Sequence, residues 1–229
     1  MKKHIVCFGD SNTHGYCAEN GGRFDENERW THLLQRHLGD EYLIIEEGLS
    51  GRTACFDDPL FEGLAGLDYI WPCLMSHEPV DLLIIMLGTN DTKERFGASA
   101  ACIALGLKRL IGRAMAVTDC WRDGKPNILV VTPQNIGREY IDTEVGSTMG
   151  RGCAEKSEGL AEEYEKIADM MGCYYLDANK VISASVNQID FMHLTKEGHE
   201  QLASALAEVI GTIIVGAGCD GTCGGSVGD

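Results

Sequence analysis

Hydrophobic and polar positions along the chain follow two alternating patterns. Short runs that are almost wholly apolar predict buried strands at residues 5–8, 42–45, 81–87, 127–132 and 173–176. Between them, apolar residues recur at helical spacing and predict helices at 28–38, 69–76, 98–117, 155–171 and 195–214. Strands that alternate with helices predict an α/β fold, with one doubly wound parallel sheet covered by helices on both faces.

The length and composition fit one domain. The chain has 229 residues, of which 44% are hydrophobic, enough for a substantial single core. We expect this domain to span residues 1–215 and the glycine-rich residues 216–229 to form a flexible tail. Two irregular stretches, 53–79 and 134–150, interrupt the alternation near strand ends. Because long loops in compact domains usually carry function, we expect both to lie at the mouth of the sheet.

Charge and hydropathy exclude several classes of partner. With 35 acidic against 19 basic residues the formal net charge is −16, which disfavours nucleic acid. Apolar runs are too short to cross a bilayer, and the four apolar residues after Lys3 are too few for the core of a signal peptide. The chain is therefore expected to be cytoplasmic, with neither a nucleic-acid nor a membrane partner.

The ten cysteines are scattered singly, and some, such as Cys7 and Cys102, lie inside apolar stretches. This distribution indicates reduced core residues rather than a disulfide framework. The close pair Cys219 and Cys223 lacks the second pair and the nearby histidine that a zinc site needs. We therefore predict no metal site.

Residues that could take part in catalysis follow the ends of the predicted strands. Ser11 follows the first strand, Gly51 the second and Asn90 the third, while Asp190 and His193 lie between the fifth strand and the last helix. Alone, Ser11 and Asp190 are more typical of helix caps. Together, at the carboxyl edge of one parallel sheet, these residues include every group that ester hydrolysis needs: a nucleophile, a base, a carboxylate that orients the base, and oxyanion donors.

The same residues resemble the four sequence blocks of the SGNH (GDSL) hydrolases. The blocks are Gly-Asp-Ser at 9–11, Gly51, Gly-Thr-Asn-Asp at 88–91, and Asp190-x-x-His193, in the family's order. The likeness covers nearly the whole chain, to about residue 214. The longer segments 7–11, 46–53 and 84–93 are similar to the arylesterase/acyltransferase branch of that superfamily.

The resemblance implies a fold and a role for each matched residue. The fold would be a flavodoxin-like three-layer sandwich with a five-stranded parallel sheet. Ser11 would be the nucleophile, His193 the general base and then acid, and Asp190 its orienter. The backbone N–H groups of Ser11 and Gly51 and the side-chain amide of Asn90 would form the oxyanion hole. No cofactor is implied, and the branch suggests a homo-oligomer in which loops 53–79 and 134–150 meet a neighbour.

The residues after the nucleophile depart from the branch, which often has apolar or aromatic residues there. This chain has Asn12 and His14, with Tyr16 keeping an aromatic ring. We interpret Asn12, His14 and Tyr16 as substrate-binding, and the pocket mouth as polar. The alcohol side of the ester is then expected to be hydrophilic, as in an acetylated carbohydrate.

We interpret the carboxylates of Asp10 and Asp91 as structural, with hydrogen bonds from neighbouring loop amides. A second carboxylate beside Ser11 would oppose the negative charge of the oxyanion.

The expected function is a serine esterase for small, short-chain (acetyl-type) esters, acting through an acyl-enzyme on Ser11. Alcohols would compete with water for that acyl group, so acyl transfer is a second expected outcome. A lysophospholipase or thioesterase for longer acyl chains would use the same machinery. A carbohydrate-binding module without catalysis is a third alternative from another class.

Overall fold

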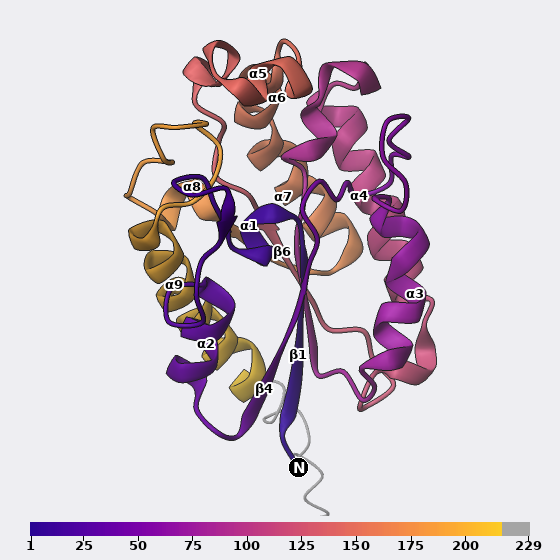
Figure 1. Ribbon diagram of the computed structural model, residues 1–229. Coiled ribbons are helices and arrows are strands. Elements are labelled where there is room, and N and C mark those ends of the chain that lie inside the picture. The colour runs from indigo at the N-terminus through magenta and orange to yellow at the C-terminus, as the bar shows by residue number, and fades with distance from the viewer. Residues whose placement is uncertain (217–229) are drawn as a thin grey trace, which may run out of the picture.

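The computed structural model describes residues 1–216 of the chain and contains a five-stranded parallel sheet in the order β4-β1-β5-β6-β7 (Figure 1). Its strands are β1 (Lys3–Gly9), β4 (Tyr42–Gly48), β5 (Leu82–Met86), β6 (Ile128–Thr132) and β7 (Tyr174–Asp177). In chain order of the five strands this is 2-1-3-4-5, the flavodoxin-like order of doubly wound sheets. Each predicted apolar run is a strand, so the predicted α/β fold is confirmed.

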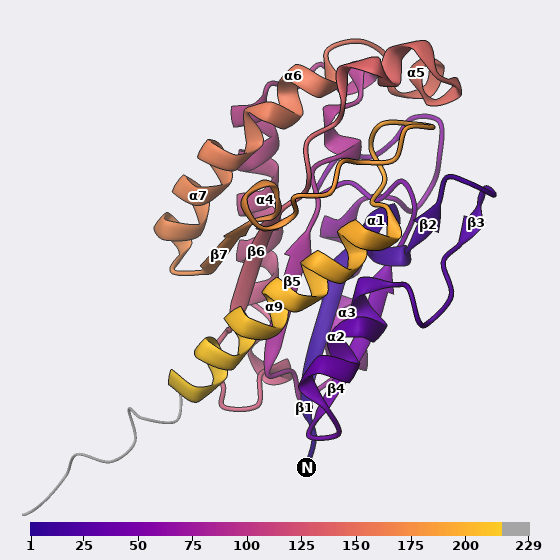
Figure 2. The ribbon, with the colours of Figure 1, turned by 90° about the vertical axis from the view of Figure 1, so that its left-hand side faces the viewer.

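Helices cover both faces of the sheet and make it a three-layer sandwich. One face carries α2 (Trp30–Leu38) and α9 (Lys196–Gly216), which Figure 2 shows in front of the sheet. The other face carries α3 (Gly66–Ser76), α4 (Ala100–Met115) and α7 (Leu160–Met171) (Figure 1). The carboxyl ends of the strands point away from the N-terminus, toward α1 (Ser11–His14).

The core has one half on each side of the sheet because successive side chains of a strand point to opposite faces. In β1, Ile5 and Cys7 pack with α2 and α9, while Val6 and Phe8 pack with the helices of the opposite face. All five residues of β5 and all five of β6 are buried. This two-sided burial explains why the central strands read as continuous apolar runs rather than as alternating patterns.

The predicted helix 155–171 is in fact two helices, and this prediction was wrong at one residue. Helix α6 (Cys153–Glu158) ends at Gly159, and α7 begins at Leu160. A Cβ at Gly159 would stand 3.1 Å from the Cβ of Ala100, so the glycine permits a close approach to α4. An isolated glycine in a helical pattern gives only a weak break signal.

The two stretches predicted as loops contain short helices. The first, 53–79, holds the whole of α3, which begins at residue 66 rather than at the predicted 69, and the second, 134–150, holds η4 (Arg138–Asp142) and α5 (Glu144–Met149). Other short elements were not predicted. They are α1, β2 (Tyr16–Cys17), β3 (Gly22–Arg23), η1 (Asn90–Thr92), η2 (Glu94–Phe96), η3 (Thr118–Cys120) and α8 (Ala178–Val181).

Some sequence predictions fall beyond the described residues. Helix α9 extends to Gly216, and the rest of the predicted tail, with Cys219 and Cys223, lies outside the described part of the chain. The domain boundary at residue 215 therefore stays a prediction. Within residues 1–216, the eight cysteines are free thiols. In that same range, we find no helix with the length and apolarity that a membrane crossing requires.

Candidate active site

Ser11 follows the carboxyl end of strand β1, at the first position of α1. The turn is formed by Asp10, whose carboxylate accepts a hydrogen bond of 3.0 Å from the backbone N–H of Asn12. Gly9 is needed before it, because a Cβ there would stand 2.0 Å from the hydroxyl of Thr13. Strand, glycine and capped turn together hold the Ser11 side chain at the edge of the sheet, where it is 7% exposed.

The structure brings Ser11, His193 and Asp190 into one chain of hydrogen bonds. His193 Nε2 lies 2.8 Å from Ser11 Oγ, and His193 Nδ1 lies 2.7 Å from Asp190 Oδ2. A carboxylate only accepts, so Nδ1 carries the proton and Nε2 is left to accept one from the serine hydroxyl. This is the protonation state in which an imidazole can act as general base toward Ser11.

Asp190 is held as a carboxylate. Burial alone raises the pKa of its carboxyl group, but hydrogen bonding and charge from His193 oppose burial, as do the backbone N–H groups of Met192 and His193. The net effect lowers the pKa of Asp190 to about 2. Asp190 is therefore ionised near neutral pH, and its carboxylate keeps the proton of His193 on Nδ1.

The loop that carries Asp190 and His193 is organised by Asn187, which the sequence analysis did not identify. The Asn187 side-chain amide donates to Asp190 Oδ1 and to the carbonyl of His193, both at 2.9 Å. Its carbonyl oxygen accepts from the N–H groups of Ile189 and Asp190. Within this loop Phe191 adopts a left-handed φ of 58°, unusual outside glycine. In the sequence, the signal that could have identified Asn187 is its position three residues before Asp190.

Gly51 and Asn90 line the same cavity as Ser11. Gly51 has a φ of 89°, which favours glycine, and follows β4 by three residues. Within the described chain, the N–H groups of Ser11 and Gly51 donate to no backbone or side-chain acceptor. Asn90 begins η1, and its amide nitrogen lies 3.5 Å from Asp10 Oδ2. Three residues that carry N–H donors therefore line one cavity.

Asp10 and Asp91 bond neighbouring loop amides, in agreement with their structural interpretation. Asp91 is fully buried, and its Oδ1 accepts from the N–H of Ala54 at 2.8 Å. Burial, reinforced by the charge of Asp10, raises the pKa of Asp91 to about 7. Asp91 ties the loop that contains Ala54 to η1, and so helps to place Asn90.

A cavity of about 470 Å³ opens over these groups, a size typical of small-molecule sites. Its floor contains Ser11, Gly51, Asn90 and His193. Its walls are Tyr16, Ser50, Phe61, Glu62, Leu64, Thr89, Lys93, Val145, Thr148, Met149 and Met192. The wall residues come largely from the stretches 53–79 and 134–150, so both predicted loops do lie at the mouth of the sheet.

Of the three residues interpreted as substrate-binding, only Tyr16 lines this cavity, with its ring centroid 4.5 Å from that of His193. Asn12 is buried under the nucleophile turn and bonds the backbone of Met192 and Leu194. His14 packs at the end of β4, where a Cβ on Gly48 would collide with its backbone. Asn12 and His14 are thus not among the residues that line this cavity, and a substrate-binding role for them stays a prediction.

A buried ion cluster joins the cavity walls. The carboxylate of Asp58 is bonded by Arg95 at 2.8 and 3.1 Å and by Lys93 at 3.3 Å. Arg95 also donates to the carbonyl of Thr148 at 2.6 Å. Burial raises the pKa of Asp58, but the hydrogen bonds from Arg95 and from the N–H of Leu60, together with the charges of Lys93 and Arg95, outweigh burial and hold that pKa below its usual value. The cluster fixes the first loop against the second.

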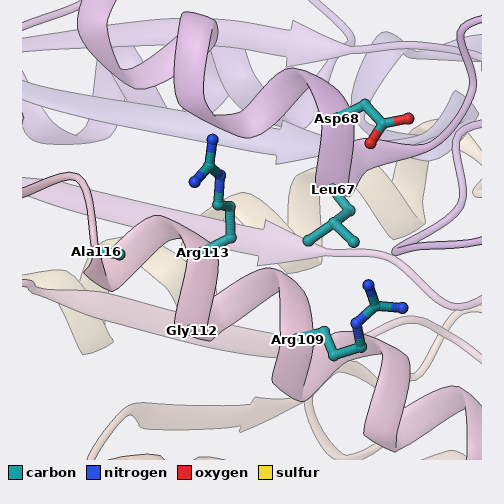
Figure 3. Close-up of a pocket in the computed structure, with 6 residues that line it drawn as sticks. All are labelled: Leu67, Asp68, Arg109, Gly112, Arg113 and Ala116. Carbon is teal, nitrogen blue, oxygen red and sulfur yellow. The ribbon is translucent and has the colours of Figure 1, made fainter.

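Other candidate sites do not share this chemistry. A hollow between α3 and α4, lined by Asp68, Arg109 and Arg113 among others, contains no nucleophile (Figure 3). Elsewhere, donor atoms of Glu47, Cys73 and His77 lie within 4.8 Å of one another. Their mixed chemistry would suit zinc. However, the imidazole of His77 and the carboxylate of Glu47 form a hydrogen bond with each other. The positive charge of Arg52 also acts on Cys73, so it would repel a bound cation.

Comparisons with known proteins agree with this geometry. The family model described as GDSL-like Lipase/Acylhydrolase family matches residues 7–201. The structure of Est24, a carbohydrate acetylesterase from Sinorhizobium meliloti, is 36% identical, with a TM-score of 0.85, over 93% of this chain and 100% of that one. The aryl esterase of M. smegmatis is also 36% identical, with a TM-score of 0.85, over 92% of this chain and 99% of that one.

More distant structures share the fold alone. A lipase/acylhydrolase from Enterococcus faecalis is 18% identical, with a TM-score of 0.67, over 91% of this chain and 95% of that one. A comparison with curated protein sequences found no match.

Proposed function

The chain belongs to the GDSL-like lipase/acylhydrolase family, and from this membership we propose that it hydrolyses small acetyl-type esters through an acyl-enzyme on Ser11. It is an ester hydrolase, and the residue roles below are our assignment. In the first step Ser11 Oγ attacks the ester carbonyl carbon while His193 Nε2 takes the hydroxyl proton. Asp190 stabilises the imidazolium that forms and holds its orientation.

The tetrahedral intermediate places a negative charge on the former carbonyl oxygen. The N–H groups of Ser11 and Gly51 and the amide of Asn90 donate to that oxygen. The bond to the alcohol oxygen then breaks as His193 returns the proton to the leaving alcohol. Water then attacks the acyl carbonyl while His193 takes one of the two water protons. His193 gives that proton to Ser11 Oγ as the acyl–serine bond breaks, and the other proton stays on the carboxylic acid. The products are the carboxylic acid, the alcohol and free enzyme, and no cofactor takes part.

One observation carries this proposal. Asp190, His193 and Ser11 are joined by hydrogen bonds of 2.7 and 2.8 Å, and the serine opens into a cavity that also contains Gly51 and Asn90. A module that only binds carbohydrate needs neither a serine hydroxyl bonded to a histidine nor N–H groups without an acceptor beside it. The arrangement therefore favours catalysis over binding without turnover.

The experiment is a series of p-nitrophenyl esters from acetate to dodecanoate, with the Ser11→Ala protein as control. A cavity of about 470 Å³ that also holds the alcohol favours short acyl groups. We expect kcat/KM to be highest for acetate and to fall steeply beyond butyrate. Activity that persists at C8 and longer chains would instead support the lysophospholipase or thioesterase alternative.

Acetylated carbohydrate is the second candidate substrate class. Its original basis, Asn12 and His14, lies outside the cavity, but Ser50, Glu62 and Thr148 give the wall polar groups that sugar hydroxyls can bond. Tyr16, Phe61 and Met149 would equally accept an aryl group. We propose to measure phenyl acetate and acetylated sugars side by side. A kcat/KM much higher for phenyl acetate would reject the carbohydrate assignment.

Replacing Asn90 by alanine is expected to lower kcat by about 10²- to 10³-fold, because one of three oxyanion donors is removed. KM for p-nitrophenyl acetate should change little, since the amide stabilises charge that exists only in the transition state. Steady-state kinetics at saturating ester provide the measurement. If kcat stays within threefold of wild type, Asn90 is not an oxyanion donor.

Three finer expectations remain proposals. Acyl transfer follows from the acyl-enzyme and would show as ester exchange in dilute alcohol. Self-association is supported by the exposed side chains of Leu60 and Phe61, at 66% and 53%, the second of which lines the cavity. A monomeric mass by light scattering would reject it. A cytoplasmic location suits the eight free thiols of the described residues, because a reducing compartment keeps thiols unpaired.

A further inference from the structure

Asn12, next to the nucleophile, uses all four of its polar groups in buried hydrogen bonds. Its backbone N–H donates to Asp10 at 3.0 Å, and its backbone carbonyl accepts from the indole of Trp30 at 3.1 Å. Its side-chain oxygen accepts from the N–H of Leu194 at 2.9 Å, and its side-chain nitrogen donates to the carbonyl of Met192 at 3.4 Å. With 4% exposure, Asn12 does not reach the cavity.

The two side-chain bonds of Asn12 end on the residues immediately before and after His193. The side-chain amide of Asn12 thus holds the loop that carries His193 from both sides of that residue. His193 lies 182 positions along the chain from Ser11. Asn187 holds the same loop from within, through the carbonyl of His193. Asn187 fixes the shape of the loop, but it has no bond to the nucleophile turn. Asn12 supplies that connection, because it is covalently joined to Ser11.

We propose that Asn12 is a positioning residue that sets the distance between Ser11 Oγ and His193 Nε2. This inference rests on the proposed function, since it assigns Asn12 a part in activating Ser11. The contact that Asn12 protects is the 2.8 Å hydrogen bond through which the proton is transferred. A shift of about 1 Å at such a contact can cost about 10²-fold in rate.

The side chain at position 12 must donate a hydrogen bond to Met192 and accept one from Leu194, and the amide of asparagine does both. Aspartate accepts only, so it would satisfy Leu194 but set a lone pair against the carbonyl of Met192. Leucine, of similar volume, would leave both backbone groups buried without a partner. Replacement is therefore expected to release the loop rather than to alter the cavity, which predicts a loss in kcat with little change in KM.

The test compares Asn12→Leu and Asn12→Asp with wild type on p-nitrophenyl acetate. We expect kcat to fall about 10- to 100-fold in the leucine variant, and less in the aspartate variant, which keeps the bond to Leu194. KM should stay within about twofold in both. Ser157→Ala is the matched control: it also removes a buried side-chain bond to a backbone N–H, that of Ile136, outside the cavity. That control should lose thermal stability but keep its kcat.

A second readout separates this proposal from the proposed function. The rate at which a serine-directed phosphonate modifies Ser11 reports nucleophile activation without any ester. We expect Asn12→Leu to be labelled at least tenfold more slowly than wild type. Labelling and kcat within twofold of wild type in a folded Asn12→Leu or Asn12→Asp protein would overturn the positioning role. Absence of labelling in wild type itself would overturn the proposed function instead.

Discussion

Ser11→Ala is expected to lower kcat for p-nitrophenyl acetate by about 10⁶-fold, the loss seen when a triad that acts as a unit loses its nucleophile. His193 and Asp190 cannot compensate, because the imidazole would have no hydroxyl from which to take a proton. The substitution removes one hydroxyl whose single side-chain partner in the described chain is His193. The melting temperature should therefore stay close to that of wild type, so that lost activity is not lost folding. Near-normal turnover would falsify the assignment of Ser11.

Asp190→Asn is expected to lower kcat by about 10⁴-fold, through the tautomer of His193. In the structure Asp190 Oδ1 accepts from Asn187 and from the N–H groups of Met192 and His193. Those three donors require the amide oxygen of an asparagine at the Oδ1 position. Its NH₂ group would then face His193 Nδ1, which must become an acceptor. The proton moves to Nε2, and the imidazole can no longer accept from Ser11.

The control for this variant is Asp177→Asn. Asp177 is also a buried aspartate that bonds local amides, through the N-cap of α8, but it lies outside the cavity. Stopped assays over several hours can resolve a 10⁴-fold loss when the ester blank is subtracted. We expect Asp177→Asn to keep wild-type kcat. If Asp190→Asn retains more than a tenth of wild-type kcat, His193 does not depend on Asp190 for its tautomer.

Much of the fold and the spatial grouping of the site could be predicted from the sequence, because both follow from strand ends. Continuous apolar runs mark strands that are covered on both faces, and parallel strands place their carboxyl ends at one edge. Ser11, Gly51 and Asn90 follow three such ends within a few residues. Backbone topology alone therefore brings them together, whatever the surrounding side chains do.

The features that the sequence analysis missed depend on how loops fold and on contacts between loops. The contribution of Asn187 depends on a loop fold with a left-handed Phe191, which periodicity does not reveal. The cavity walls come from loops tied by the Asp58–Arg95 pair, 37 positions apart. Asn12 and His14 were assigned to the pocket because they adjoin Ser11 in sequence. A helical turn sends neighbouring side chains in different directions, so adjacency to Ser11 in sequence did not place these two residues in the cavity wall.

Covalent labelling of Ser11 tests the central claim most directly. Wild-type protein, treated with a serine-directed phosphonate and digested with a protease, should yield one modified peptide, with the added mass on Ser11. Ser11→Ala should stay unmodified, and His193→Ala should react far more slowly, because no base takes the hydroxyl proton. Modification of another serine, or none in an active wild-type preparation, would contradict a nucleophile at Ser11.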